Sequence, residues 1–511
     1  MPFRRAALST HDGEPEPGSP EWWLACLERR HKAEVEDLAR LNAHYEGSQP
    51  LSYMAPELVL ELADRLRQVV VAWPQLVIDS VEERLDVEGF RLAEEPEADE
   101  DLWALWQAND LDEWSQQAHL DALIMRRSYA IIGTNDEDAS RPLVSVESPL
   151  QVIHERDPRT RKVSAAAKFW SDGDGDRKRC ATLYLPNSTS WWLHDGHRWV
   201  PDGGDRAVDE HGRGVVPVEP IVNRPRLRAA TAHIDAGSLG EGTSDLAPVI
   251  PLSDAACKIA TDMMVAAEFH AMPRRWALGF APEDFQDEHG NPVGAFSRVA
   301  GRLWATERTK QDGAEVGQFP ESNLSGFHDT MKLLGQLVAS VSGLPPHYLG
   351  LVTDNPSSAD AIRSGEARLV KRAERKQRSF GGSWERVMRL AMLWRDGTVP
   401  PEAMQMETIW RDAATPTIGQ RADAAVKLFT SNVVPLRQTR EDLGYSATQI
   451  ERMEEQDERA AALAFGLTPP DKTGTPPAAA SGMDGGAGDG EDGADGGDGA
   501  EPADGAPAAE D

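Results

Sequence analysis

The sequence predicts an α+β fold that is predominantly helical. Three observations lead to this prediction. Apolar residues recur at helical spacing in long segments toward both ends of the chain. Between residues 128 and 223, short β-prone runs alternate with turn residues. Two further helical segments, at residues 252–272 and 321–343, bracket a short insert. We therefore expect a helical frame that carries a β-rich subdomain.

The 511 residues carry a formal net charge of −32. By its length, the chain is expected to hold roughly three domains with an ample apolar core. Proteins that coat nucleic acid need a broad surface of Lys and Arg to displace counterions, so this charge argues against such a role. The negative charge remains compatible with a protein that lets DNA slide past its surface without binding it tightly.

The cysteines and apolar runs bear on the compartment. Cys26, Cys180 and Cys257 lie far apart and form no CxxC pair, which argues against a disulfide framework or a zinc ribbon and fits a reducing compartment. The N-terminus lacks the apolar core of a signal peptide. No run of 18 apolar residues occurs, so no membrane association is expected.

The N-terminal part is expected to be mostly helical. Residues 1–20 are rich in Pro, Gly and Glu and are expected to be mobile. Apolar residues then recur at intervals of three and four, as in helices that bury one face. The expected elements are a helix over Glu21–Tyr45, a helix over Pro56–Ala72, a strand over Leu76–Ser80, and helices over Asp101–Arg127 with a break near Asn109.

From Ser128 to Asn223 the pattern changes to short strands separated by turn residues such as Asp195-Gly196. Such regular spacing predicts one antiparallel meander. The strand candidates are Tyr129–Thr134, Leu143–Ser148, Val152–Glu155, Val163–Trp170, Arg179–Leu185, Ser190–Leu193 and Arg198–Pro201.

A helical hairpin with a small cap is expected next. Ser253 is a candidate N-cap for a helix that runs to about Ala271, where Pro273 forbids continuation. The returning helix is expected over Asn323–Ser342. The residues between them form a small α/β insert, with strand candidates at Arg275–Gly279 and Gly301–Ala305.

Beyond Pro345-Pro346 the sequence predicts a loop and then a long helix that starts near Ala359, with Gly381-Gly382 weakening or kinking it. Shorter helices are expected over Thr417–Ser431, Leu436–Leu443 and Ser446–Phe465. The remainder is Pro, Gly, Ala and Asp, with eleven acidic residues against one lysine from Asp471 onward. This tail lacks the apolar residues needed to fold and is expected to be disordered.

No sequence motif for catalysis or cofactor binding is found. The Walker pattern, HExxH and GxSxG are absent. Asp172-Gly-Asp-Gly-Asp176 superficially suggests a calcium loop, but Arg177 and Leu183 occupy the positions that need Gly and Glu, so a hairpin turn is the expected structure. We expect no enzyme activity, no cofactor and no bound metal.

The long helix carries the strongest charge feature. Its cations are Arg363, Arg368, Lys371, Arg372, Arg375, Lys376 and Arg378, against Glu366 and Glu374. Three interpretations remain open for this basic helix. It is a solvated face, it pairs with an acidic neighbouring subunit, or it contacts DNA phosphates.

Four stretches resemble the portal proteins of tailed bacteriophages, in particular those of actinobacterial phages. They are Leu41–Leu51 (LNAHYEGSQPL), Val77–Phe90 (VIDSVEERLDVEGF), Pro217–Pro225 (PVEPIVNRP) and Ser340–Gly350 (SVSGLPPHYLG). The order of elements is similar too, from about Glu21 to Phe465. The resemblance implies a portal-type fold with wing, stem helices, α/β clip, tunnel loop, long kinked helix and helical crown.

That resemblance divides the chain. It implies a disordered N-terminus (1–20), a wing (21–251, with its meander at 128–223), a first stem helix (252–272), a clip (273–320), a second stem helix (321–343), a tunnel loop (344–358), a long wing helix (359–400), a crown (401–467) and a disordered acidic tail (468–511).

The resemblance also implies a function. Portal subunits form a ring, usually of twelve, at one vertex of the capsid in the virion, after assembly in the host cytoplasm. Double-stranded DNA enters through the ring, driven by the terminase large subunit, and is retained and later ejected. The major capsid protein, the scaffold and the head–tail connector are the further partners implied. The side chains expected near the DNA channel are His347, Tyr348, Leu351, Asp354 and Asn355.

Two other classes of protein remain as alternatives. One is another structural or adaptor protein of the virion, although adaptors are normally much shorter and lack the paired stem helices. The other is a nuclease fused to a structural frame, which would need a cluster of metal ligands that no motif in the sequence supplies.

Overall fold

The computed structural model describes most of the chain, in two compact units, Met1–Thr415 and Pro416–Asp511. The described residues are 15–50, 69–93, 98–135, 137–138, 140–172, 178–203, 207–226, 242–271, 275–278, 313, 315–318, 324–351, 359–414, 418–445 and 447–464.

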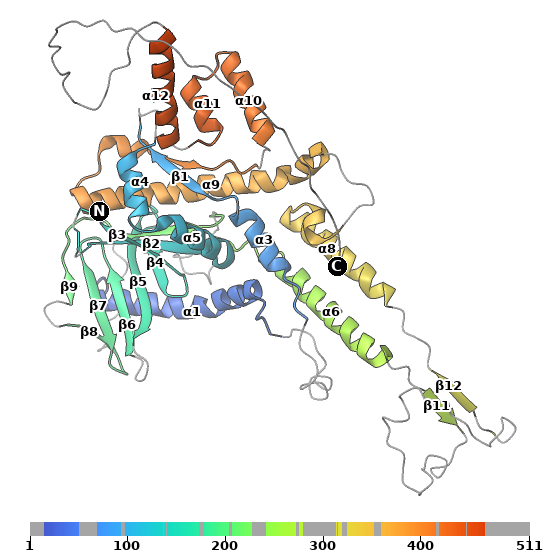
Figure 1. The fold of residues 1–511 in the computed structure, drawn as a ribbon. Helices are drawn as coiled ribbons and strands as arrows, with labels where there is room; N and C mark the ends of the chain where they lie inside the picture. Colours follow the sequence, from blue (N-terminus) through green and yellow to red (C-terminus); the bar gives the residue numbers. More distant parts are fainter. Residues whose placement is uncertain are drawn as a thin grey trace, which may run out of the picture. The chain divides into compact units, whose positions relative to one another are not determined.

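The first unit contains helices, shown as coiled ribbons in Figure 1, and two short 3₁₀ turns. The helices are α1 (Pro20–Glu46), α3 (Trp73–Glu82), α4 (Glu100–Gln107), α5 (Leu111–Met125), α6 (Ile250–Ala271), α8 (Ser325–Ser342) and α9 (Ala359–Asp396), and the turns are η5 (Pro346–Leu349) and η6 (Pro401–Gln405). Ser19 caps α1, its hydroxyl accepting from the Trp22 N–H, and Gly47 ends the helix in the left-handed conformation. These helices confirm the predictions over Glu21–Tyr45 and Asp101–Arg127, including the break near Asn109.

Antiparallel sheets complete this unit. The strands are β1 (Val87–Arg91), β2 (Arg127–Gly133), β3 (Leu143–Glu147), β4 (Val152–Arg156), β5 (Val163–Asp172), β6 (Lys178–Tyr184), β7 (Thr189–His194), β8 (Trp199–Pro201), β9 (Val208–Asp209), β10 (Val218–Val222), β11 (Arg275–Leu278), β12 (Glu315–Gln318) and β13 (Glu407–Trp410). The largest sheet has the order β4-β5-β6-β7-β8, with β9 beside β7. A second has the order β10-β2-β3, and β1 pairs with β13 and β11 with β12.

The β-rich subdomain confirms the predicted strands but corrects the prediction of a single meander. Strands β4 to β8 do form a meander of consecutive neighbours. Strands β2 and β3 belong instead to a separate sheet, because β2 pairs on its other side with β10. That pairing joins segments about ninety residues apart, which hairpin spacing does not reveal.

One element was predicted wrongly. Residues Leu76–Ser80 were expected to be a strand, and they lie in α3 instead. Val77, Ile78 and Val81 of this helix are completely buried, so the apolar run Leu76–Ile78 belongs to a helix surrounded by other elements. A short apolar run of this kind has the same pattern in a buried strand and in a buried helix.

The predicted hairpin of two helices is present, but its first helix begins earlier than expected. Helix α6 begins at Ile250, three residues before the candidate cap Ser253. Ser253 lies inside the helix, buried, and its hydroxyl donates to the carbonyl of Val71. Helix α6 packs against α8, and beyond their far ends the strands β11 and β12 pair antiparallel. The strand candidate at Gly301–Ala305 lies outside the described residues.

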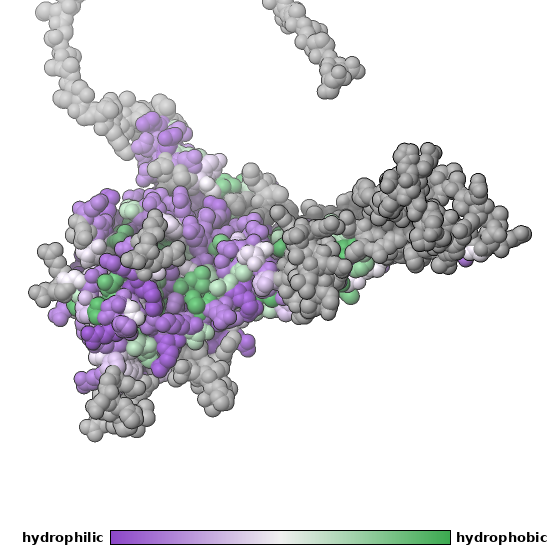
Figure 2. Space-filling model, turned by 90° about the horizontal axis from the view of Figure 1, so that it is seen from below, coloured by the Kyte–Doolittle hydropathy of each residue, from purple (hydrophilic) through white to green (hydrophobic). Residues whose placement is uncertain are grey.

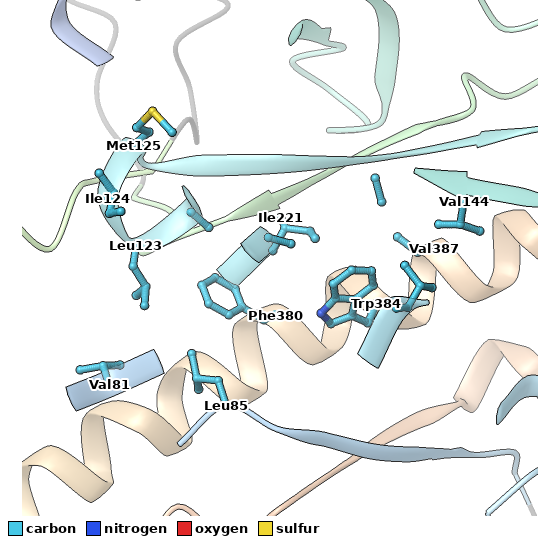
Figure 3. Packing of buried hydrophobic residues seen from close by; sticks show 14 of the residues in the cluster. Val81, Leu85, Leu123, Ile124, Met125, Val144, Ile221, Phe380, Trp384 and Val387 are labelled. Atoms are coloured by element: carbon cyan, nitrogen blue, oxygen red, sulfur yellow. The ribbon is translucent and has the colours of Figure 1, made fainter. Parts of the chain in front are cut away.

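Helix α9 forms the centre of the main core (Figure 3). Phe380, Trp384 and Val387 are fully buried on one face, among Leu123 of α5 and Ile221 of β10. The indole N–H of Trp384 donates to Nε2 of the buried His119 over 2.8 Å. This packing explains why the β10-β2-β3 sheet and the helices α3 and α5 lie around α9.

Helix α9 is continuous through Gly381 and Gly382. A Cβ at Gly381 would lie 3.0 Å from Nε1 of Trp410 and 3.4 Å from Cβ of Thr408. Gly381 therefore allows strand β13 to pack closely against the helix, and the Thr408 hydroxyl donates to its carbonyl.

A smaller core lies between α1 and the large sheet. Leu24 and Leu27 of α1 pack on one face of the sheet, against apolar residues of β4 to β7. The alternation along β5 places Ala165, Ala167 and Phe169 on this face.

The second unit contains α10 (Ile418–Thr430), α11 (Leu436–Asp442) and α12 (Ala447–Ala464), as predicted. Arg437 and Arg440 of α11 pair with Glu454 and Asp457 of α12. The remaining predictions concern residues 1–14, most of the helix over Pro56–Ala72, the turn after Asp172 and the tail from Thr468, which lie outside the described residues.

The visible surface of the described residues is predominantly hydrophilic and is interrupted by small hydrophobic patches (Figure 2). Among the residues that the structure describes, no helix combines the length and apolar composition of a membrane span.

Candidate functional site

The connection from α8 to α9 is the segment for which the sequence predicts contact with DNA. Helix α8 ends at Gly343, which has a φ of 76° and donates its N–H to the carbonyl of Ala339. Pro345 and Pro346 then prevent the helix from resuming and lead into the 3₁₀ turn η5. Gly350 ends this turn with a φ of 69°. Two glycines in the left-handed conformation therefore frame a compact turn.

Tyr348 is fixed by a network within the chain. Its hydroxyl donates to a carboxylate oxygen of Glu366 over 3.1 Å and accepts from Nη2 of Arg84 over 3.3 Å. Arg84 also donates to the carbonyl of Ala413 over 2.7 Å. Burial and the neighbouring Glu366 carboxylate raise the pKa of Tyr348. The hydroxyl thus joins η5 to Arg84, in the turn after α3, and to Glu366 of α9.

The other predicted channel residues differ in exposure. His347 is exposed, with its ring at 4.9 Å and 73° from that of Tyr348. Leu351 is half-buried, close to Gly335 of α8. Asp354 and Asn355 lie outside the described residues.

The predicted basic residues of α9 fall on two sides of the helix. Lys371 and Arg375 are exposed, and Lys371 pairs with Glu374. Arg368 is exposed and donates to the carbonyl of Ser340 over 2.9 Å. Arg372 is largely buried. Arg363 lies in the first turns of the helix, where the structure does not describe its side chain.

Arg372 and Lys376 meet at Asp245, whose side chain is 1% exposed. Nη2 of Arg372 lies 3.0 Å and Nζ of Lys376 lies 2.9 Å from its carboxylate oxygens. Nε of Arg224 approaches to 3.1 Å, and the side-chain amide of Asn223 donates over 3.2 Å. We call these five residues the Asp245 cluster.

The Asp245 cluster holds three cations against one carboxylate. Burial opposes ionisation of Asp245, but Lys376, Arg224 and Arg372 outweigh it and keep the pKa of this carboxyl low. Burial lowers the pKa of Lys376 to about 8, in spite of the attraction of Asp245. Arg372 also donates to the carbonyl of Ser342, at the C-terminus of α8, where the helix dipole places partial negative charge.

The contacts of Arg368 and Arg372 link α9 to the two paired helices. Through Arg372 and Arg368, α9 binds the terminal carbonyls of α8, and through the same Arg372 it binds the segment that leads into α6. The cluster therefore holds the ends of the two paired helices and the start of the α8–α9 connection together.

The sequence contained a signal for this cluster that spacing alone could reveal. Leu369, Ala373 and Phe380 are fully buried and lie on one face of α9. Lys376 lies on that same face, three residues after Ala373 and four before Phe380. A cation on an apolar helix face calls for a buried acidic partner. Its identity as Asp245, over a hundred residues earlier in the chain, could not be predicted from spacing.

Among the described residues, no group of three or more His, Cys, Asp and Glu side chains is placed to hold a metal ion. The arrangement around the connection consists of helix caps, ion pairs and one tyrosine anchor. It positions a segment of chain.

Comparison with known proteins identifies the family. A family model described as phage portal protein, SPP1 Gp6-like, matches residues 25–462. The chain belongs to this family. It is 36% identical over 442 residues to the portal protein of Mycobacterium phage D29, covering 84% of this chain and 87% of the relative. The portal protein of Mycobacterium phage L5 matches with the same identity and the same coverage.

Two solved structures show a more distant likeness. They are the neck of a native GTA particle, with C12 symmetry, and the neck of an empty GTA particle, with C6 symmetry. Their TM-scores are 0.40 and 0.41 at 13% identity, over 80% of this chain and 99% and 98% of theirs.

The resemblance seen in the sequence is thus confirmed as membership of the family. The chain is a portal protein of a tailed phage, a structural component of the phage particle.

Proposed function

We propose that this portal protein assembles into a ring, of about twelve subunits, through which double-stranded DNA enters, is held in and leaves the capsid. The observation that carries the proposal is the match to the portal family across residues 25–462, together with 36% identity to two named portal proteins. Closed cyclic assembly fits such a subunit because a heterologous contact that closes forms no open fibre.

We assign the proposed portal domains to the helices and strands of the structure. Helices α6 and α8 would be the stem, and the chain between them, residues 273–320, would be the clip that meets the terminase and later the head–tail connector. The helices α10 to α12 would belong to the crown. The packing of α6 against α8 supports the stem assignment, since the pair leads to β11 and β12.

Residues 344–358 would be the loop that projects into the channel. Its near end is anchored by Tyr348, and the Asp245 cluster holds the end of α8 before it through Arg372, while His347 is exposed. A firmly anchored base suits a loop that must move against passing DNA. The net charge of −32 discourages tight phosphate contacts, each of which would add affinity and hence friction.

The terminase large subunit would supply the energy for packaging, because this sequence holds no Walker motif. The major capsid protein and the scaffold would contact the ring at its vertex during assembly in the host cytoplasm.

The test is deletion of residues 352–355, which shortens the stretch Leu351–Asn355 and leaves both anchors in place. We expect rings to form as in the unaltered protein, and DNA packaging or retention in particles to fall. Electron microscopy measures the rings, and nuclease-protected DNA per particle measures packaging. A deletion protein that forms rings and packages normally contradicts the role of the loop. Loss of the rings would make this segment a subunit interface instead.

A further inference from the structure

The exposed side of α9 carries a row of cations. Arg368, Lys371, Arg375 and Arg378 are all exposed and follow each other at intervals of three, four and three, which places them on one face of the helix. Glu374 is the one acidic residue within that stretch, and it pairs with Lys371. We call these four residues the basic row.

Among the residues that the structure describes, most of the basic row has no acidic partner. Within the part of the chain that the structure describes, Lys371 has Glu374 and Arg368 has the Ser340 carbonyl. No ion pair or hydrogen bond of the side chains of Arg375 and Arg378 is found among the described residues. This contrasts with Arg372 and Lys376 on the inner side, which are bound to Asp245.

Helix α8, whose C-terminal end Arg368 contacts, presents an exposed apolar row. Leu333, Leu337 and Val341 recur every four residues and are 55%, 42% and 44% exposed. Between residues 333 and 343 the chain has no charged side chain at all. The end of this row at Val341 follows Ser340, whose backbone carbonyl accepts from Arg368 of the basic row.

We propose that these two rows form a contact surface for a second copy of this chain, with the cations facing acidic residues of the neighbour. The chain has 85 acidic and 53 basic residues, so the surface of a second copy is the complementary partner for a local excess of positive charge. Copies with a net charge of −32 repel one another at a distance, and a contact therefore needs a region free of negative charge.

The apolar row favours a protein partner over DNA. Protein interfaces combine an apolar centre with a polar rim, and the leucines of α8 beside the cations of α9 have that composition. Contacts to a DNA backbone are made by charged and polar groups and gain nothing from exposed leucines. The inference rests on the proposed ring and names one of the surfaces that would close it.

The experiment compares two charge reversals of equal size in the full chain. The test variant is K371E/R375E/R378E, which leaves the Arg368 contact to α8 intact. The control is R159E/R161E/K162E, which reverses three exposed cations at the turn between β4 and β5. Circular dichroism checks that both variants fold, and mass photometry measures ring and monomer against protein concentration. A second variant, L333S/L337S, tests the apolar row.

We expect the test variant and L333S/L337S to dissociate at protein concentrations about tenfold or more above those of the unaltered protein, with the control unchanged. If the rings of the test variant and of the control variant dissociate at the same protein concentration, the proposed contact surface is wrong. The ring itself would still be established by that result. Intact rings that bind duplex DNA more weakly would also overturn it, in favour of a DNA contact. A folded, unaltered protein that stays monomeric at all concentrations, also when the capsid protein is added, contradicts the proposed ring, and this surface with it.

Discussion

At the residue scale, Asp245 is the one carboxylate found in contact with Arg372 and Lys376 in the part of the chain that the structure describes. Replacing it with Asn would leave buried cations without a counter-charge. We predict that Asp245→Asn lowers the free energy of unfolding by about 3–5 kcal/mol, the usual cost of breaking a buried ion pair. Denaturant unfolding measures it.

Asp423→Asn is the matched control for this prediction, because Asp423 and its partner Lys427 are both 77% exposed. That change should cost less than about 1 kcal/mol. Adding Lys376→Met to the Asp245→Asn variant should recover part of the loss, since it removes one of the unpaired charges. If Asp245→Asn lowered the free energy of unfolding by less than about 1 kcal/mol, the Asp245 cluster would not stabilise the fold.

His119 makes stability depend on pH. Burial lowers its pKa to about 3, and its ring stacks on Phe380 at 5.2 Å. In the unfolded chain a histidine titrates near pH 6.5, so between about pH 3 and 6.5 the unfolded state binds the extra proton. Stability is therefore lost as pH falls through this range, by about 2 kcal/mol from pH 6.5 to 4.5 for this residue.

We predict that His119→Gln flattens the pH dependence of unfolding between pH 4.5 and 6.5, because a neutral amide can accept from Trp384 without titrating. Denaturant melts of both proteins across this range measure the difference in slope. Part of the slope should remain, since burial also holds the pKa of His154 well below its usual value. Parallel curves for the two proteins would contradict this assignment.

At the scale of elements, the end of α8 offers a direct comparison of two glycines. Gly343 and Gly350 both have positive φ, at 76° and 69°. A Cβ at Gly343 would lie 2.9 Å from Nε of Arg368, whereas no atom lies within 4 Å of a Cβ at Gly350. Each substitution by Ala should cost about 1–2 kcal/mol for the left-handed backbone.

We predict that Gly343→Ala costs more than Gly350→Ala in thermal or denaturant unfolding, because only Gly343→Ala also displaces Arg368 from the Ser340 carbonyl. The difference between the two variants measures that helix-end contact. If Gly350→Ala proved equal or worse, Arg368 would not be holding the end of α8.

The elements differ in how far the sequence predicts them. Long amphipathic helices such as α1 and α9 were predicted correctly because one buried face repeats over many turns. The short strands β1 and β13 were missed, since each has four or five residues and they pair across some 320 residues of chain. Local patterns hold no information on such pairing.

The candidate site was predicted less completely. The sequence places His347 and Tyr348 together near the proposed channel, and the structure adds that the Tyr348 hydroxyl binds Glu366 and Arg84. The basic residues of α9 were treated as one group, and the structure separates an inner pair from an outer row. That division follows from the helical period once the buried face is known, but the partner Asp245 follows from the tertiary structure alone.

At the scale of the whole molecule, different parts of the chain have different structural tasks. The core around α9 and the Asp245 cluster fix the paired helices α6 and α8, and the connection after α8 starts from that fixed base. In the proposed ring, the outer surface of α9 and α8 would be free for contacts between copies. The proposed channel, loop and contact surface all depend on closure of that ring.

The most direct measurement is electron microscopy of the purified full-length protein with class averaging. The account predicts rings of about a dozen subunits around a central channel. A population of monomers or compact dimers at every concentration, unchanged when the capsid protein is added, would contradict it.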